Sequence, residues 1–261
     1  MKTIFASFSS EYLKLRNSRI FWIILFIFTI IPFMIGLMMF VARNPDMAAK
    51  LGMVGTKAQL FGKNEWAGFF DTLNQSAAGV DLIGFGFVTS WIFGREYSER
   101  TLKDLLALPV SRTTIVIGKF LVTIVWCILL ILVIYFAGIG AGWLIHIPDW
   151  SFPVFYRFSH KFFVSSLLTL VLVTPVGFFA SYGKGLIAPL GFVILTLVLA
   201  QFLGLVGLGS YFPWAIPGLY ITPAGTSGME LHLYSYIILF CTSLMGLIGT
   251  IAYWQKADQH I

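Results

Sequence analysis

Three short patterns in the sequence contain residue types that occur in catalytic or nucleotide-binding sites. The run Gly-Thr-Ser-Gly at 225–228 has the Gly-x-Ser-Gly order of some intramembrane serine proteases. The run Gly-Lys-Gly at 183–185 is the one candidate for a phosphate-binding loop, and Glu96 and Glu99 could serve a glutamate- or metal-dependent hydrolase. Each pattern would make the chain an enzyme or a nucleotide-binding protein. A pattern is evidence for such a function only if all the residues that the motif requires are present.

None of the three patterns is complete. A nucleophilic serine needs a base within hydrogen-bond reach, but the apolar run after Ser227 contains no histidine, and His232 lies in the serine's own loop. A phosphate-binding loop needs Gly-x4-Gly-Lys-Ser/Thr, whereas Phe178 and Gly185 occupy the first and last of those positions. The histidines also lack the i, i+4 pairing of a helical metal site. We therefore expect no catalytic site, no metal site and no cofactor in this chain.

The composition indicates a membrane protein. The 261 residues are 58% hydrophobic and 11% charged, with a mean hydropathy of +0.89, whereas soluble domains are about 45–50% apolar and about 25% charged. The net charge of +6 comes from Lys and Arg that separate apolar runs, not from the single basic face that nucleic-acid binding needs. A water-soluble enzyme is excluded, and no nucleic-acid partner is expected. Both cysteines lie within apolar runs, so we expect no disulfide.

Six apolar runs approach or exceed the roughly 20 residues that a membrane-spanning helix needs. They lie at about 20–41, 75–93, 115–145, 162–182, 186–208 and 234–254. The second run is the weakest, because Asp81 interrupts it. The sequence therefore predicts an all-α polytopic fold with one transmembrane domain over 20–261 and no soluble domain.

The distribution of basic residues predicts the orientation. With the N-terminus inside, Lys or Arg at 2, 14, 16, 19, 95, 100, 103, 112, 119, 184 and 256 are cytoplasmic, and those at 43, 50, 57, 63, 157 and 161 are outside. Cytoplasmic loops are ordinarily the richer in Lys and Arg. We therefore expect both termini in the cytoplasm and a multi-pass protein of the plasma membrane, of bacterial origin.

Two segments beside the spans have interfacial character. Residues 1–19 place Ile4, Phe5, Phe8, Tyr12 and Leu15 near one helical face, which predicts an amphipathic helix on the inner leaflet, with a disordered tail as the alternative. Residues 209–230 are aromatic, contain three prolines and lack Lys and Arg. Irregular backbone at membrane depth must be buried in protein, so we expect a re-entrant or interface-hugging hairpin on the outer side, between the fifth and sixth spans.

The connection between the second and third spans is the most patterned loop. Glu96 with Arg100, Glu99 with Lys103 and Arg100 with Asp104 are spaced i, i+4, which favours a helix. Four leucines at 102, 105, 106 and 108 supply an apolar side, and Pro109 disfavours helical geometry at the residue before it. The pattern predicts a short amphipathic helix at the cytoplasmic face.

The same loop carries a family resemblance. The run Glu-Arg-Thr-Leu-Lys-Asp-Leu-Leu-Ala-Leu-Pro-Val-Ser-Arg at 99–112, followed by Lys119, resembles the loop of ABC-2 type permeases, the membrane subunits of ATP-driven exporters. The likeness is greatest to the bacitracin-resistance and lantibiotic-immunity branch. The six spans, the amphipathic N-terminal helix and the apolar hairpin also match. One departure is Arg100, where many members have glycine before the threonine.

The resemblance implies that this loop is a coupling helix, which docks in a groove of a separate ATPase subunit. The residues that it implicates are Glu96, Glu99, Arg100, Thr101, Leu105, Leu106, Pro109 and Arg112. It also implies two ATPase copies that bind ATP and Mg, a second permease copy or a sister permease, and an amphipathic substrate such as a peptide antibiotic or a lipid-like molecule. The alternatives are a solvated, lipid-hugging loop and an ATP-independent immunity or channel-like protein.

Asp81 is the starting point for a substrate path, because intramembrane acids usually face a bundle interior or a water-filled cavity. At about 1.5 Å per residue, Asp81 lies roughly 22 Å from Glu96, in the outer half of the membrane. Asn74 lies seven residues before Asp81 and therefore on the same helical face. We expect Asn74, Gln75 and Asp81 to meet the substrate or a dimer seam. Alternatively, the helix starts late and Asp81 reaches only the headgroups.

Overall fold

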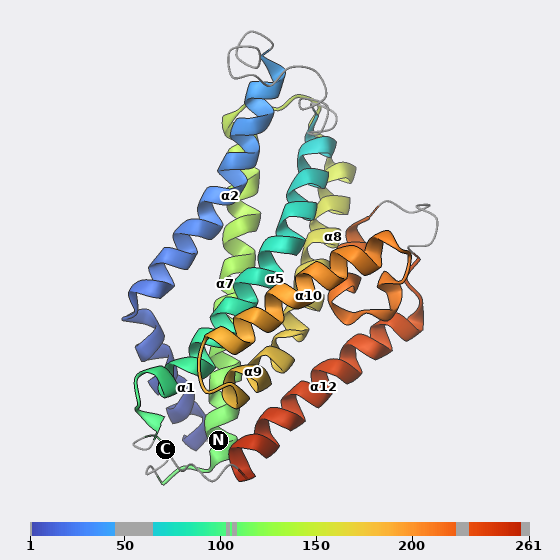
Figure 1. Ribbon diagram of the computed structural model, residues 1–261. Helices are drawn as coiled ribbons and strands as arrows, with labels where there is room; N and C mark the ends of the chain where they lie inside the picture. The colour runs from blue at the N-terminus through green and yellow to red at the C-terminus, as the bar shows by residue number, and fades with distance from the viewer. Residues whose placement is uncertain (1, 45–64, 103–104, 106–108, 223–229, 257–261) are drawn as a thin grey trace.

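The computed structural model of the chain describes residues 2–44, 65–102, 105, 109–222 and 230–256, and their regular secondary structure is entirely helical. The helices are α1 (Lys2–Arg16), α2 (Arg19–Arg43), α5 (Trp66–Ser98), α7 (Arg112–Leu144), α8 (Phe152–Val171), α9 (Val173–Tyr182), α10 (Ile187–Leu205), η1 (Gly209–Tyr211), η2 (Pro213–Ala215), α11 (Ile216–Ile221) and α12 (Leu233–Lys256). Figure 1 labels most of them.

Six helices in the described ranges are long and apolar enough to cross a membrane, so the predicted number of spans is confirmed. They are α2, α5, α7, α8 continued by α9, α10 and α12. Two of the predicted starts are wrong, because α5 begins at Trp66 and α8 at Phe152. The polar residues Asn74 and Lys161 interrupt the hydropathy there, but the helices continue through them into an aromatic cluster that includes Trp66.

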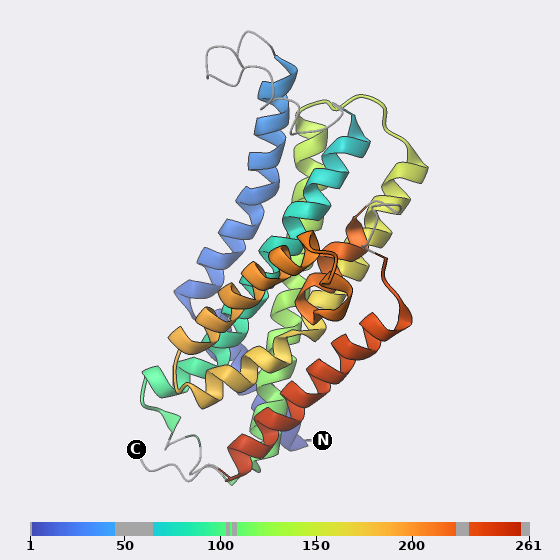
Figure 2. The ribbon, with the colours of Figure 1, turned by 45° about the vertical axis from the view of Figure 1, so that its right-hand side comes forward.

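The helices define two ends of the molecule. The start of α1, the first turn of α7 and the last turn of α12 lie together at the lower end of Figure 1, which we call the termini end. The opposite, far end carries the last turn of α2 and the first turns of α5 and α8. Figure 2 shows that α10, α12 and the segment between them end short of the far ends of α5 and α8.

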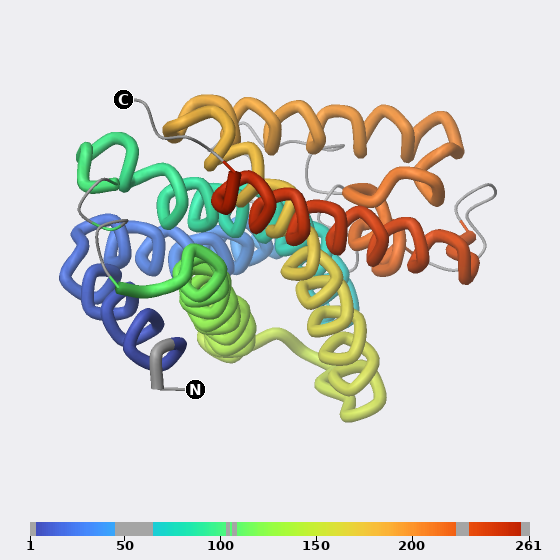
Figure 3. The backbone as a smooth tube through the Cα atoms, turned by 90° about the horizontal axis from the view of Figure 1, so that it is seen from below, coloured from blue at the N-terminus to red at the C-terminus, as the bar shows by residue number. Residues whose placement is uncertain are grey.

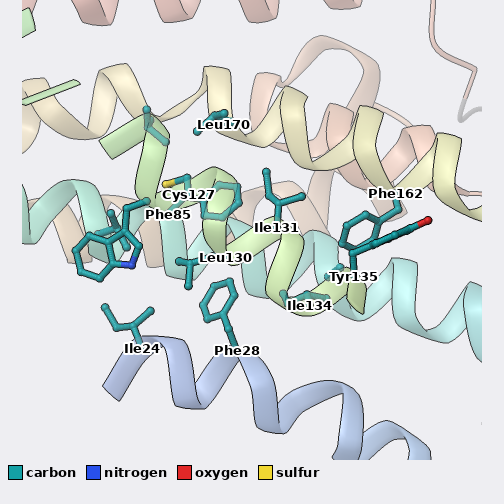
Figure 4. Packing of buried hydrophobic residues seen from close by; sticks show 14 of the residues in the cluster. Ile24, Phe28, Phe85, Cys127, Leu130, Ile131, Ile134, Tyr135, Phe162 and Leu170 are labelled. Carbon is teal, nitrogen blue, oxygen red and sulfur yellow. The ribbon is translucent and has the colours of Figure 1, made fainter. Parts of the chain in front are cut away.

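Helix α7 lies at the centre of the apolar core. Figure 4 shows side chains of α7, among them Cys127 and Leu130, between Phe28 of α2 and Phe85 of α5, with α8 on the other side. Gly84 of α5 permits this packing, because the Phe28 ring occupies the space that a Cβ atom would need. The first turns of α7 are therefore held in a fixed relation to α2 and α5.

Helix α1 packs against α7, and the two helices lie side by side in the view from the termini end (Figure 3). Ser7 lies against Gly118, and Glu11 is only 5% exposed, whereas Phe5 and Tyr12 are exposed. An amphipathic surface helix ordinarily turns its polar side chains to water. In this chain Ser7 and Glu11 contact the protein instead, on a mixed face that also buries Leu15.

The segment 209–222 forms a compact hairpin from η1, η2 and α11, which packs against α8, α10 and α5. Its prolines prevent a continuous helix, and some carbonyl groups are left to side-chain donors. Ser165 Oγ donates to the Pro217 carbonyl at 2.9 Å, and Lys161 Nζ donates to the Ile221 carbonyl at 2.9 Å. The irregular backbone is thus hydrogen-bonded to α8.

Candidate functional site

Four charged side chains form an ion cluster at the termini end, made of Glu11, Lys14, Glu96 and Lys119. Lys119 Nζ is 3.1 Å from Glu11 Oε2 and 3.2 Å from Glu96 Oε1, and the lysine is 0% exposed. Lys14 Nζ is 2.9 Å from Glu11 Oε1 and 3.0 Å from Glu96 Oε1. A buried charge is strongly unfavourable unless it is paired, and here two carboxylates balance two ammonium groups.

Hydrogen bonds extend the ion cluster to the backbone and to the α5–α7 connection. Lys119 Nζ also donates to the Ile92 carbonyl at 3.1 Å, and Thr101 Oγ1 donates to Glu96 Oε2 at 2.6 Å. Glu96 lies in the last turn of α5, and Lys119 lies near the start of α7. The ion cluster therefore joins α1 and both ends of the connection into one unit.

Lys14 is the more exposed cation of the cluster, with 30% of its side chain accessible. Burial lowers the pKa of Lys14, but the adjacent carboxylates of Glu11 and Glu96 outweigh burial and raise that pKa above its ordinary value of 10.5. Lys14 is consequently charged at neutral pH.

Three of the residues predicted to couple to an ATPase make contacts inside the chain. Glu96 is 2% exposed and belongs to the ion cluster, and Thr101 is bonded to Glu96. Arg112 donates to the carbonyls of Trp254 at 3.0 Å and Gln255 at 3.2 Å, which ties α7 to the last turn of α12.

The other predicted coupling residues lie nearer the surface. Glu99 has 53% of its side chain exposed, Arg100 and Pro109 are also exposed, and Leu105 is half-buried. Leu106 lies outside the described residues, as do 103–104 and 107–108, so the predicted coupling helix is described only at Leu102 and Leu105, which both have helical backbone.

The expected pairing of Glu96 with Arg100 is wrong. Helix α5 ends at Ser98, and Arg100 has a φ of 57°, so it does not share a helical face with Glu96. Instead, Arg95 lies 3.7 Å from Glu99. A positive φ is strained for a residue with a Cβ atom but not for glycine, which gives a physical reason for the glycine of similar loops at this position.

A groove of about 490 Å³ lies between α5, α8, α10 and the hairpin. Its lining includes Gln75 and Gly79 of α5, Gln201 and Gly204 of α10, and Trp214 of the hairpin. The indole N–H of Trp214 is buried without a hydrogen-bond partner among the described residues. The groove is therefore mainly apolar, with a few polar groups that could orient a ligand.

Of the residues predicted to line a substrate path, the structure brings Gln75 to the groove but not Asn74 or Asp81. Asp81 is 0% exposed and accepts a hydrogen bond from Ser166 of α8. Asn74 lines a hollow of about 180 Å³ together with Arg157 and other residues of α8. The prediction that Asn74 and Asp81 share a face is confirmed, because both face α8. The alternative that the helix starts late is wrong, because α5 begins at Trp66.

Comparison with known proteins decides the family. The family model described as ABC-2 family transporter protein matches residues 7–202. The chain is also 29% identical over 185 residues to the bacitracin transport permease protein BCRB of Bacillus licheniformis, covering 69% of this chain and 88% of that protein. The chain belongs to the ABC-2 transporter family. It is thus a multi-pass membrane protein and a transport component rather than an enzyme, and its family implies an ABC ATPase partner in general.

The catalytic patterns gain no support in this ABC-2 permease. The described residues contain no group of three or more His, Cys, Asp or Glu side chains that could hold a metal ion. Ser227 lies outside the described residues. Cys127 is buried and Cys241 is exposed, and both are free.

Sequence reasoning missed several residues that organise the ABC-2 permease. Lys119 stands inside a long apolar run, and the principle that drew attention to Asp81 also applies to it, since buried charges need partners. The partners themselves could not be found from spacing, because Glu11 is 108 residues away and Glu96 is 23 residues away. Ser166 is one of many serines in apolar runs, and no sequence signal distinguishes it.

Proposed function

We propose that this chain is the membrane-spanning subunit of an ATP-driven exporter, which moves an amphipathic substrate across or out of the bacterial plasma membrane. The substrate is a peptide antibiotic or a lipid-like molecule, as family membership and the name of the bacitracin permease relative suggest. ATP and Mg bind to a separate ATPase. This chain supplies the path and the contact with that ATPase.

The proposed orientation puts the termini end in the cytoplasm and the far end outside, because eleven of the 17 Lys and Arg residues are then cytoplasmic. Helix α1 lies at the inner interface, with the exposed Phe5 and Tyr12 toward lipid. The hairpin at 209–222 is the outer re-entrant element, and its bonds to α8 support that role.

The contact with the ATPase is formed by side chains of the α5–α7 connection, namely Glu99, Arg100, Leu105 and Pro109. Leu106, which follows Leu105 in the sequence, belongs to the same proposed contact. Glu96, Thr101 and Arg112 act as positioning residues within the chain. The single observation that carries this proposal is the Glu96–Lys119 pair, which spans the connection. Because the pair also holds α1, movement of the connection is transmitted to three helices together.

The substrate path includes the groove between α5, α10 and the hairpin. Its apolar wall suits the apolar part of an amphipathic molecule, while Gln75, Gln201 and the Trp214 indole N–H suit its polar part. Asn74 and Asp81 support the path from the α8 side of α5. A second permease copy or a sister permease closes the groove, and two ATPase chains complete the assembly.

An ATP-dependent uptake assay tests this proposal. The permease is co-expressed with a candidate partner ATPase of the ABC type, and inverted membrane vesicles are supplied with labelled bacitracin. We expect uptake that requires both ATP and the ATPase subunit. Protection of cells or uptake of the peptide in the absence of the ATPase would favour an ATP-independent immunity protein and contradict the proposal.

A further inference from the structure

A second cavity, of about 430 Å³, lies between α8 and α11 and has no part in the proposed export mechanism. Six residues line it: Tyr156, Arg157, His160, Lys161, Tyr220 and Thr222. Two of them are the basic side chains of Arg157 and Lys161, one is a histidine, and none is acidic. The cavity is therefore electropositive and rich in hydrogen-bond donors.

The positive charges of this cavity make no close ion pair within the described part of the chain. No ion pair of 4.0 Å or less engages Arg157, His160 or Lys161 there. Asp71 lines the neighbouring hollow of about 180 Å³ together with Arg157 and Lys161, and it attracts Lys161 electrostatically without forming an ion pair of 4.0 Å or less with either cation. Lys161 donates one hydrogen bond to the Ile221 carbonyl, and its other N–H groups can bind a ligand. All the N–H groups of the Arg157 guanidinium can bind a ligand as well.

A phosphate group matches these donors in charge and in number of acceptors. It carries a charge between −1 and −2 and three or more strong acceptor oxygens, and the planar guanidinium of arginine binds two such oxygens at once. His160 and Tyr220 provide further polar groups, with Tyr220 Oη 3.5 Å from His160 Nδ1. A single carboxylate would leave part of the positive charge without a partner.

The cavity lies at the depth where the phosphates of a lipid leaflet are expected. Helix α10 has 19 residues and α12 has 24, close to the roughly 20 that cross the hydrocarbon core, and the hairpin connects them. Helices α5 and α7 have 33 residues each and project beyond the hairpin (Figures 1 and 2). Lys161 is bonded to the hairpin at Ile221, so the cavity is at the hairpin level, near the boundary of the hydrocarbon.

The cavity also adjoins a mainly apolar groove. Thr222 lines both this cavity and the groove of about 490 Å³ on the other side of α11. We propose that Arg157, His160 and Lys161 bind a phosphate group, and that the apolar groove beyond Thr222 favours a lipid as the molecule that carries it. Its phosphate lies among the three basic side chains, and its chain extends toward the groove.

Equilibrium binding to the purified full-length chain in an uncharged detergent tests the proposal. Three probes are compared by titration: dioctanoyl phosphatidylglycerol, dioctanoylglycerol, which has the same chains without phosphate, and inorganic phosphate. We expect the phospholipid to bind saturably and Arg157→Gln to weaken it about tenfold, as for loss of a hydrogen bond to a charged group. Lys256→Gln removes the same charge from an exposed position at the termini end and leaves binding unchanged.

The outcomes separate the two sources of phosphate. Inorganic phosphate that binds as tightly as the phospholipid, with the same dependence on Arg157, supports the phosphate site and makes the free ion its occupant. Equal binding of dioctanoylglycerol, no saturable binding of any probe, or equal weakening by both variants overturns the site. Arg157 makes no hydrogen bond or ion pair with the described part of the chain, so Arg157→Gln is expected to fold, and His160→Gln provides a second variant. ATP-dependent uptake is measured separately, so failure here leaves the proposed export function standing.

Discussion

Lys119 Nζ lies 3.2 Å from Glu96 Oε1, although 23 residues separate the two side chains along the sequence. This pair closes the base of the α5–α7 connection, and Glu11 brings α1 into the same cluster. The two ends of the connection, at Glu96 and Lys119, are consequently joined to each other by an ion pair, and the same cluster joins them to α1.

Loss of Lys119 should destabilise the permease. In Lys119→Met, the two carboxylates Glu11 and Glu96 share only Lys14, so the cluster carries one uncompensated buried negative charge. Removing one partner of a buried ion pair costs about 3–5 kcal/mol, and we expect a loss at the lower end of this range because Lys14 remains. The unfolding midpoint in detergent measures it, with the exposed Lys256→Met as the control.

A second variant separates charge balance from packing. Lys119→Met combined with Glu96→Gln leaves Glu11 and Lys14 as a neutral pair, so we expect the double variant to recover part of the lost midpoint. If the double variant unfolds at or below the midpoint of the single variant, charge balance is not what holds the three helices together.

The backbone conformation at Arg100 predicts how substitutions at this position change thermal stability. Its φ of 57° suits glycine, and a β-branched residue fits it poorly. We expect Arg100→Gly to keep or raise thermal stability and Arg100→Val to lower it by about 1–2 kcal/mol. Equal midpoints for the two variants would show that this turn relaxes without cost.

The groove can be filled without disturbing its walls. A Cβ atom at Gly79 would meet no atom within 4 Å, so Gly79→Leu should fold and place its side chain in the groove. The added side chain makes binding of a substrate in the groove less favourable by about 1–3 kcal/mol. We therefore expect uptake to fall about tenfold. Gly140→Leu is the matched control, because Gly140 is also helical, has open space around it and lies outside the groove. Equal uptake by the two variants would remove the groove from the path.

The orientation is tested by labelling with an impermeant maleimide. Single cysteines replace Ser98, exposed at the termini end, or Glu230, exposed just before α12, in a chain with Cys127→Ala and Cys241→Ser. In intact cells we expect reaction at position 230 and none at 98 until the cells are opened. Reaction at 98 in intact cells would reverse the orientation and remove the ATPase contact from that surface.

The spans were predictable because the hydropathy of a helix depends on the residues of that helix alone, whereas the sites depend on contacts between helices. The long apolar stretch of α7 was evident from its hydropathy. The far-end turns of α8 contain Arg157 and Lys161, which lower the local hydropathy, so the predicted start of that span was too late. The spacing of Asn74 and Asp81 correctly placed them on one face. It could not reveal that this face meets α8 at Ser166 instead of the groove.

Local charge spacing misled at the α5–α7 connection. Glu96 and Arg100 have the separation of a helical pair, yet Lys119 and Lys14 lie close enough to Glu96 to hold it, and the helix ends at Ser98. The polar side of α1 was likewise ambiguous, because the same residues could face water or a buried partner. Both outcomes depend on Lys119, whose partners come from distant parts of the chain.

Retention of the ATPase subunit on the purified permease tests most directly the claim that the α5–α7 connection couples the two proteins. Leu105→Asp removes an apolar side chain at the proposed contact, and truncation of a central contact residue costs about 2 kcal/mol or more. Glu99→Lys reverses an exposed charge there, and Leu233→Asp makes the same leucine substitution at the exposed start of α12, away from the termini end. At equal membrane abundance, we predict that Leu105→Asp and Glu99→Lys lose the co-purified ATPase while Leu233→Asp keeps it. Full retention by the first two variants would contradict the account.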